Sequence, residues 1–173
     1  KIARAKAERA RARFPAIQTI LSTWLFDYGR DQGEWRGLSD AFTPRPDWCQ
    51  YIMADSHTTY PTYPLTQGVP GGLPLLNFPE ISMWEMHPWG GFGANPLPRR
   101  FGELWRKVKA HLDGGMPYSE GIYEDINKVL CLQWYWDPDR CAEMIVKDYA
   151  SFEYSPDVAD EVWRAIEILE TNH

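Results

Sequence analysis

The residues from Leu73 to Pro98 combine an apolar run with carboxylate, amide and indole side chains. The side chains in this stretch that could do chemistry are Asn77, Glu80, Trp84 and Trp89. Indole rings stack on the C–H faces of pyranose rings, and carboxylates hydrogen-bond hydroxyl groups or move protons. A buried strand that leads into such a loop is typical of the mouth of a sugar site in an α/β barrel. The alternative is an ordinary core strand whose loop aromatics pack inward.

Glu80 is the strongest candidate for a catalytic acid, because Phe78 and Ile81 flank it in sequence. Apolar neighbours disfavour the charged form of a carboxyl group, and a group kept protonated can serve as a proton donor. The alternative is a structural ion pair between Glu80 and Arg99 or Arg100. The residues around Glu80 leave both interpretations open.

Two further carboxylates each come directly after an apolar run. Asp27 follows Ile17–Phe26, and Asp55 follows Tyr51–Ala54. Either carboxylate could bind a sugar hydroxyl or act in catalysis, and the alternative for Asp27 is a cap of the following turn. These two residues therefore join Glu80 as catalytic candidates.

An indole and an imidazole accompany these two carboxylates. Trp24 precedes Asp27 by three residues, and His57 follows Asp55 by two. We expect Trp24 to add a stacking surface behind the loop tryptophans, and His57 to bind substrate beside Asp55. A single histidine in a loop is more often structural, which is the competing interpretation of His57.

The elements that must position these groups follow from the spacing of apolar residues. Strands are predicted at Ile17–Phe26, Tyr51–Ala54 and Leu73–Phe78, and helices at Lys1–Phe14 and Gly33–Phe42. Polar residues follow each strand at its carboxyl end. Because the carboxyl ends of parallel strands meet at one edge, we expect an α/β sheet whose site lies along that edge.

The chain beyond Leu97 has a helical pattern throughout. The apolar stripes of four predicted helices lie at Phe101–Val108, Ile122–Leu130, Asp139–Phe152 and Val158–Leu169. Gly114 and Gly115 are expected to stop the first helix, and Ser155 to cap the fourth. We therefore divide the chain into an α/β part at 1–98 and a helical region at 99–173.

The composition and charge of the chain limit the kinds of binding partner that we expect. The 173 residues are 44% hydrophobic and 14% aromatic, so a folded core is expected. The net charge is −6, and residues 1–13 hold six Lys or Arg against one Glu, so the other 160 residues total −11. A basic arm can contact nucleic acid, but the acidic remainder would repel phosphate, so we expect a solvated helix and no nucleic-acid partner.

Other ligands and partners are not expected. No apolar run approaches the roughly 20 residues of a membrane span. The three Cys and four His lack metal-ligand spacing, and no phosphate-binding glycine loop is present, so we predict no metal and no cofactor. The Cys residues are expected to be buried as small apolar groups. Compartment and oligomeric state stay open.

Several segments together resemble a known family. They are Ser119–Val129 (SEGIYEDINKV), Trp134–Asp139 (WYWDPD), Tyr154–His173, ILSTWLFD and GGLPLLNFPEISMW. They resemble bacterial proteins related to the DUF4838 family, to which glycoside hydrolase activity is ascribed. The resemblance implies about the last three strands of a (β/α)8 barrel, distantly similar to those of α-glucuronidases and β-hexosaminidases, followed by a helical region.

The same resemblance has consequences for the site and the extent of the protein. It adds Glu120, in the SEG motif, to the substrate-binding candidates Trp24, His57, Asn77, Trp84 and Trp89. It also implies a parent protein that extends on both sides of this chain. The chain by itself would then be inactive, because part of the carboxylate pair would lie elsewhere.

Three functions stay open from the sequence. The first is a glycoside hydrolase that cleaves poly- or oligosaccharides with carboxylate acid/base chemistry, using Glu80, Asp27 or Asp55. The second is a non-catalytic carbohydrate-binding protein on a barrel scaffold, with the same tryptophans. The third is an interaction module whose aromatics form an interface. A carbohydrate is the expected partner in the first two.

Overall fold

The computed structural model describes residues 1–26, 32–56, 60–81, 95–119 and 124–172, and these residues form two compact units. Among the described residues, unit 1 contains 1–26, 32–56, 60–78 and 111–115. Unit 2 contains 79–81, 95–110, 116–119 and 124–172. Each unit is considered separately below.

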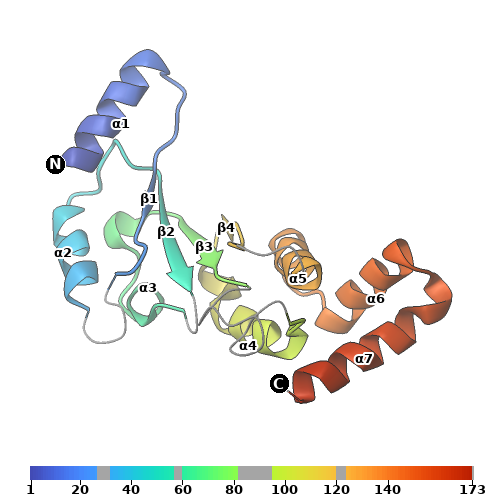
Figure 1. Cartoon of the computed structure of the whole chain (residues 1–173). Helices are drawn as coiled ribbons and strands as arrows, with labels where there is room; N and C mark the ends of the chain where they lie inside the picture. The colour runs from blue at the N-terminus through green and yellow to red at the C-terminus, as the bar shows by residue number, and fades with distance from the viewer. Residues whose placement is uncertain (27–31, 57–59, 82–94, 120–123, 173) are drawn as a thin grey trace. The chain divides into compact units, whose positions relative to one another are not determined.

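A parallel sheet is the centre of unit 1 (Figure 1). Within the described residues it has four strands in chain order, β1 (Ile20–Ser22), β2 (Tyr51–Ser56), β3 (Leu75–Pro79) and β4 (Gly114–Gly115). Ile20 pairs with Tyr51 and Leu76 with Gly114, both in parallel, and the Ile52 N–H donates to the Pro74 carbonyl at 3.0 Å. The predicted α/β class with parallel strands is confirmed.

Helices alternate with these strands along the chain. The helices of unit 1 are α1 (Ile2–Arg13), α2 (Gly33–Ala41), α3 (Thr62–Thr66) and the 3-10 turn η1 (Pro70–Gly72). The predicted helices at Lys1–Phe14 and Gly33–Phe42 are confirmed to within one residue at each end. The Trp35 indole, 2% exposed, stacks on Tyr63 with 5.9 Å between ring centroids and meets Phe26 edge-on at 5.7 Å. This aromatic cluster links α2 and α3 to the turn after β1.

The two faces of the sheet differ in burial. Along β2, Ile52, Ala54 and Ser56 are buried, whereas the alternate residues Tyr51, Met53 and Asp55 are only half-buried. Successive side chains of a strand point to opposite faces, so this alternation separates a packed face from a more accessible one. The accessible face carries Asp55.

Two segments differ from the structure predicted from the sequence. β1 covers three residues of the predicted Ile17–Phe26, because the chain turns at Thr23–Phe26 and Leu25 adopts a positive φ of 65°. Gly114 and Gly115, predicted to stop a helix, pair with β3 instead. Gly114 has φ 152°, which L side chains rarely adopt, so glycine suits this position. Apolar periodicity cannot reveal a strand made of two glycines.

Unit 2 is helical. Its elements are α4 (Pro98–Val108), α5 (Asp125–Trp136), α6 (Ala142–Glu153), the 3-10 turn η3 (Pro156–Val158) and α7 (Ala159–Thr171), with the turn η2 (Lys109–His111) after α4. α6 and α7 lie side by side (Figure 1). The Trp105 and Trp134 rings stack in the core with centroids 5.9 Å apart. Ser155 caps the 3-10 turn η3 that directly precedes α7, since the Asp157 N–H donates to the Ser155 hydroxyl at 3.2 Å.

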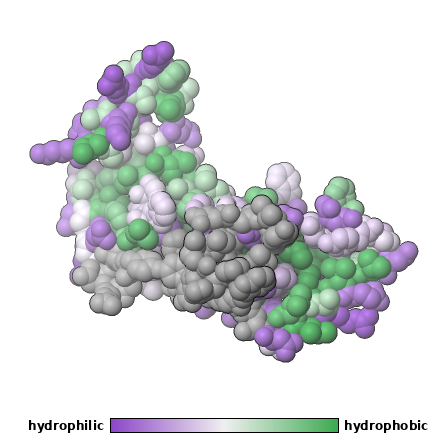
Figure 2. Space-filling model, viewed as in Figure 1, coloured by the Kyte–Doolittle hydropathy of each residue, from purple (hydrophilic) through white to green (hydrophobic). Residues whose placement is uncertain are grey.

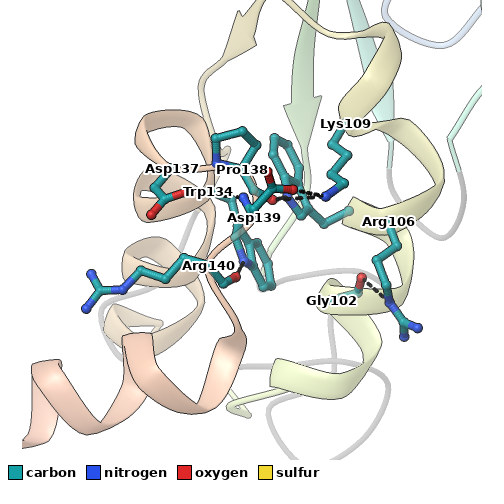
Figure 3. A network of polar contacts seen from close by, with 9 residues as sticks. Gly102, Arg106, Lys109, Trp134, Asp137, Pro138, Asp139 and Arg140 are labelled. Carbon is teal, nitrogen blue, oxygen red and sulfur yellow. Dashed lines mark hydrogen bonds and ion pairs between the residues drawn. The ribbon is translucent and has the colours of Figure 1, made fainter.

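The WYWDPD segment forms the turn between α5 and α6 (Figure 3). The indole N–H groups of Trp105 and Trp134 donate to the carbonyls of Pro138 and Arg140, both at 2.9 Å. Lys109 forms an ion pair with Asp139 at 2.5 Å (Figure 3). The turn is therefore held by side chains of α4, α5 and η2.

Parts of the predicted apolar stripes on α6 and α7 are wrong. Met144, Phe152 and Leu169 were expected to face the core, yet Phe152 is 86% exposed and the others are more than half exposed. Figure 2 shows hydrophobic residues at the surface over these two helices. The buried residues of these helices are Ile145, Val146 and Ala150 on α6, and Ala159 and Ile166 on α7. Cys141 is exposed, contrary to prediction, whereas Cys49 and Cys131 are buried.

No helix in the described part of the chain is long and apolar enough to cross a membrane.

Candidate functional site

Four of the predicted site residues can be placed in the structure. Trp24, Asp55 and Asn77 belong to unit 1, and Glu80 belongs to unit 2. The other five predicted residues lie outside the described residues, and they are Asp27, His57, Trp84, Trp89 and Glu120. The predictions for these five therefore stay predictions.

Asp55 lies next to the turn that follows β1. The Thr23 N–H and hydroxyl both donate to the Met53 carbonyl, at 3.0 and 3.2 Å, which ties the start of the turn to β2. The Leu25 N–H then donates to Asp55 Oδ2 at 3.4 Å. Leu25 has a positive φ of 65°, a conformation that costs a non-glycine residue free energy and that is common at functional sites.

The same turn presents Trp24 to solvent. The residue is 56% exposed, and its backbone N–H donates to the Ser22 hydroxyl at 3.3 Å. An exposed indole offers a stacking surface. The Leu25 contact brings the backbone next to Trp24 close to the Asp55 carboxylate in unit 1.

Tyr60 was not selected from the sequence, yet it belongs to this group. The residue is 7% exposed, and its hydroxyl has no hydrogen-bond partner within the described part of the chain. Burial raises the pKa of Tyr60 well above its ordinary value, and the negative charge of Asp55 makes a smaller contribution in the same direction. A tyrosine that precedes a proline gives no sequence signal of such burial.

Asn77 lies on the packed face of the sheet, in contact with Ser56. The Ser56 hydroxyl donates to Asn77 Oδ1 at 3.2 Å, and both residues are 6% exposed. This contact fixes the amide oxygen and leaves the amide nitrogen as a donor. Ser56, which contacts Asn77, alternates with Asp55 in burial along β2, so Asn77 and Asp55 lie on opposite faces of the sheet.

Glu80 directly follows β3 and forms a parallel bridge with Tyr118 in unit 2. The Tyr118 N–H donates to the Pro79 carbonyl at 2.8 Å, and the Ile81 N–H donates to the Tyr118 carbonyl at 3.0 Å. Glu80 is 6% exposed. A carboxylate at the end of a paired segment has its backbone fixed on both sides, which is a requirement for precise proton transfer.

The expected alternative for Glu80 involved Arg99 and Arg100. The Arg99 guanidinium forms an ion pair with Glu167 on α7 at 2.8 Å. The backbone N–H groups of Arg99 and Arg100 donate to the carboxylate of Glu170, at 3.0 and 2.9 Å. These contacts join the first turn of α4 to α7.

A second buried carboxylate, Glu124, precedes α5. It is 1% exposed, accepts a hydrogen bond from the Ser119 hydroxyl at 2.8 Å, and lies 3.6 Å from the Lys128 ammonium. These two contacts use Oε2, whereas Oε1 has no partner within the described residues. The contacts attach the start of α5 to the segment that pairs with Glu80.

Asn127 on α5 was not selected from the sequence either. Its side chain is fully buried and makes three hydrogen bonds to backbone groups. It accepts from the Leu97 N–H at 3.0 Å and donates to the carbonyls of Ile81 and Asn95, at 3.1 and 2.8 Å. One amide thus fixes Ile81 and Asn95, which lie immediately before and after residues 82–94 in sequence.

Within the described residues, no group of three or more His, Cys, Asp or Glu side chains could hold a metal ion. Neither a protein-family model, nor a curated protein, nor a solved structure matches this chain.

Proposed function

We propose that this chain is part of a glycoside hydrolase with a (β/α)8 barrel. The observation that carries this proposal is the parallel sheet, whose described strands follow one another in chain order. A barrel is built by parallel strands that neighbour each other in sequence, whereas open doubly wound sheets reverse their order at a switch point. The DUF4838 resemblance, itself a prediction from the sequence, would imply the same architecture.

The positions of the described candidate residues support the chemistry. Polar or acidic residues end β2 and follow β3, namely Asp55 and Glu80, and enzymes with this fold place their sites at the carboxyl ends of the strands. In this proposal Glu80 is the general acid, and Asp55 is a separate candidate in unit 1 for accepting hydrogen bonds from sugar hydroxyls. Trp84 and Trp89, predicted from the sequence, would stack on the sugar together with Trp24.

A non-catalytic carbohydrate-binding role is the competing proposal. It is favoured by the exposure of Trp24, because stacking on a sugar needs no proton transfer. The two proposals differ in what they require of Glu80. Only the hydrolase needs a carboxyl group at residue 80.

The test is turnover of 4-nitrophenyl glycosides by the protein that the complete open reading frame encodes. The panel contains the α-D-glucuronide, the N-acetyl-β-D-glucosaminide and the β-D-xyloside. We expect hydrolysis of at least one glycoside and a loss of at least about 100-fold in kcat in Glu80→Gln, which keeps the shape but cannot donate the carboxyl proton.

The matched control is Glu103→Gln, a change on α4 that also removes one carboxylate and that should leave kcat unchanged. Turnover that survives in Glu80→Gln would exclude Glu80 as the acid. Sugar binding without turnover of any glycoside by the unmodified protein would favour the non-catalytic proposal.

A further inference from the structure

We propose that Asn127 is a positioning residue for the proposed general acid Glu80 and acts through the backbone of Ile81. The inference rests on the proposed hydrolase function and adds to it a residue that the sequence did not indicate. Asn127 and the segment 79–81 belong to the same compact unit. The Asn127 amide is fully buried, so its role is to hold the segment that carries Glu80 and not to contact substrate.

Hydrogen bonds fix the backbone on both sides of Glu80. The Tyr118 N–H donates to the Pro79 carbonyl at 2.8 Å, and the Ile81 N–H donates to the Tyr118 carbonyl at 3.0 Å. Asn127 Nδ2 donates to the Ile81 carbonyl at 3.1 Å. Tyr118 thus holds the two peptide groups that flank Glu80, and Asn127 holds the next peptide group and connects this segment to α5.

The α5 helix is a rigid support for this contact. Asn127 is buried in the first turn of α5, and the buried residues Leu130 and Trp134 follow it by three and seven positions, on the same face of the helix. The Trp134 indole N–H donates in turn to the Arg140 carbonyl at 2.9 Å. A side chain on a packed helix is held more precisely than one on a loop, so α5 can determine the position of the Ile81 peptide group.

Asparagine at position 127 has a cost that a positioning role explains. It has a lower helix propensity than alanine, and an amide is unfavourable to bury unless it is hydrogen-bonded. Besides its bond to Ile81, Asn127 donates to the Asn95 carbonyl at 2.8 Å and accepts from the Leu97 N–H at 3.0 Å. Three bonds to backbone groups select one arrangement of the chain around Glu80.

The position of Glu80 decides whether it can donate its proton. A general acid has to lie within hydrogen-bond distance of the leaving-group oxygen, and a misplacement of ~1 Å can lower a rate about 100-fold. Loss of the Asn127 contact releases the Ile81 carbonyl, so the Glu80 carboxyl group should lie within reach of that oxygen less often. A phenolate that leaves poorly needs this proton, whereas 2,4-dinitrophenolate is stable enough to leave without it.

The test compares two glycosides of a sugar that the protein hydrolyses, one with a phenyl and one with a 2,4-dinitrophenyl leaving group. We measure kcat/KM for both with the protein that the complete open reading frame encodes. In Asn127→Ala, the ratio of kcat/KM for the phenyl glycoside to that for the dinitrophenyl glycoside should fall about 10-fold. Glu80→Gln should lower the same ratio further. Two rate constants measured on one sample share its folded fraction, so partial unfolding cannot change their ratio.

The matched control is Ile166→Ala on α7, which removes a buried apolar side chain of the same unit from a helix other than α5. This change should lower the Tm, because it leaves a cavity, and should leave the ratio unchanged. Asn127→Ser is a milder second variant, whose hydroxyl can donate to one carbonyl. It should give a ratio between those of Asn127→Ala and the unmodified protein, and it carries the test if Asn127→Ala does not fold.

The outcomes distinguish this role from the proposed function. An unchanged ratio in the Asn127 variants that fold, together with a lower ratio in Glu80→Gln, would overturn the positioning role and leave the hydrolase proposal intact. An equal fall of the ratio in Ile166→Ala would also overturn it, because any loss of stability would then be sufficient. If the unmodified protein hydrolyses no glycoside, or if Glu80→Gln leaves turnover unchanged, the choice of Glu80 as the acid and the role of Asn127 both fail.

Discussion

Asn127 in unit 2 and the buried residues Asn77 and Tyr60 in unit 1 differ in how far their hydrogen-bonding atoms are satisfied. Asn127 in unit 2 makes three hydrogen bonds. In unit 1, Asn77 has a single hydrogen bond from Ser56, and the Tyr60 hydroxyl has no partner within the described residues.

This difference separates structural groups from candidate binding groups. A fully satisfied buried amide stabilises one arrangement of the backbone and has nothing left to offer a ligand. A buried hydroxyl without a partner costs free energy in the folded state, and a ligand can recover that cost. The Tyr60 hydroxyl of unit 1 and Glu124 Oε1 of unit 2 are thus better candidates for ligand contact than the Asn127 amide.

The largest effect is expected from Asn127→Ala. The change leaves the Leu97 N–H and the carbonyls of Ile81 and Asn95 without their partner, at a cost of about 1 kcal/mol each. The free energy of unfolding should therefore fall by about 3 kcal/mol, as measured by urea denaturation. Asn172→Ala on α7 removes a single exposed hydrogen bond and should cost less than about 0.5 kcal/mol. Equal effects of the two changes would contradict the structural role of Asn127.

An intermediate effect is expected from Asn77→Ala. This change leaves the Ser56 hydroxyl unpaired and should lower the free energy of unfolding by about 1 kcal/mol. Ser56→Ala and the double variant complete a double-mutant cycle, measured by the same denaturation. We expect a coupling of about 1 kcal/mol, and a coupling near zero would show that the contact does not contribute to stability.

The smallest effect near neutral pH is expected from Tyr60→Phe, and it should grow in alkali. Burial raises the pKa of Tyr60 in the folded state, so above pH ~10 the unfolded chain loses this proton while the folded chain keeps it. The unfolded state then binds fewer protons, and the free energy of unfolding falls as pH rises. Tyr60→Phe removes this contribution.

Thermal unfolding at pH 9 and pH 11 checks this expectation. The Tm difference between Tyr60→Phe and the unmodified chain should increase in favour of the variant at the higher pH. Cys131, whose pKa burial raises to about 12, also destabilises the fold in alkali, but it is present in both proteins and cancels in the comparison. A Tm difference that stays constant with pH would mean that Tyr60 ionises alike in both states.

Local patterns in the sequence were sufficient for much of the fold. Alternating helices and apolar runs predicted α1, α2, β2 and β3 and the parallel α/β class, because periodicity and strand-end polarity are properties of neighbouring residues. The cap at Ser155 followed from the Ser-Pro-Asp order alone. Asp55 and Glu80 could be selected because each follows an apolar run.

Only the tertiary structure decided which polar groups meet. β4 consists of two glycines that are ordered by pairing with β3, and no apolar pattern marks them. Asn127 contacts residues that lie 30 to 46 positions away in the chain, and the Leu25 N–H reaches Asp55 across 30 positions. Burial of the Tyr60 hydroxyl likewise depends on what packs around it. Such contacts depend on distances in space, which residue spacing along one chain does not determine.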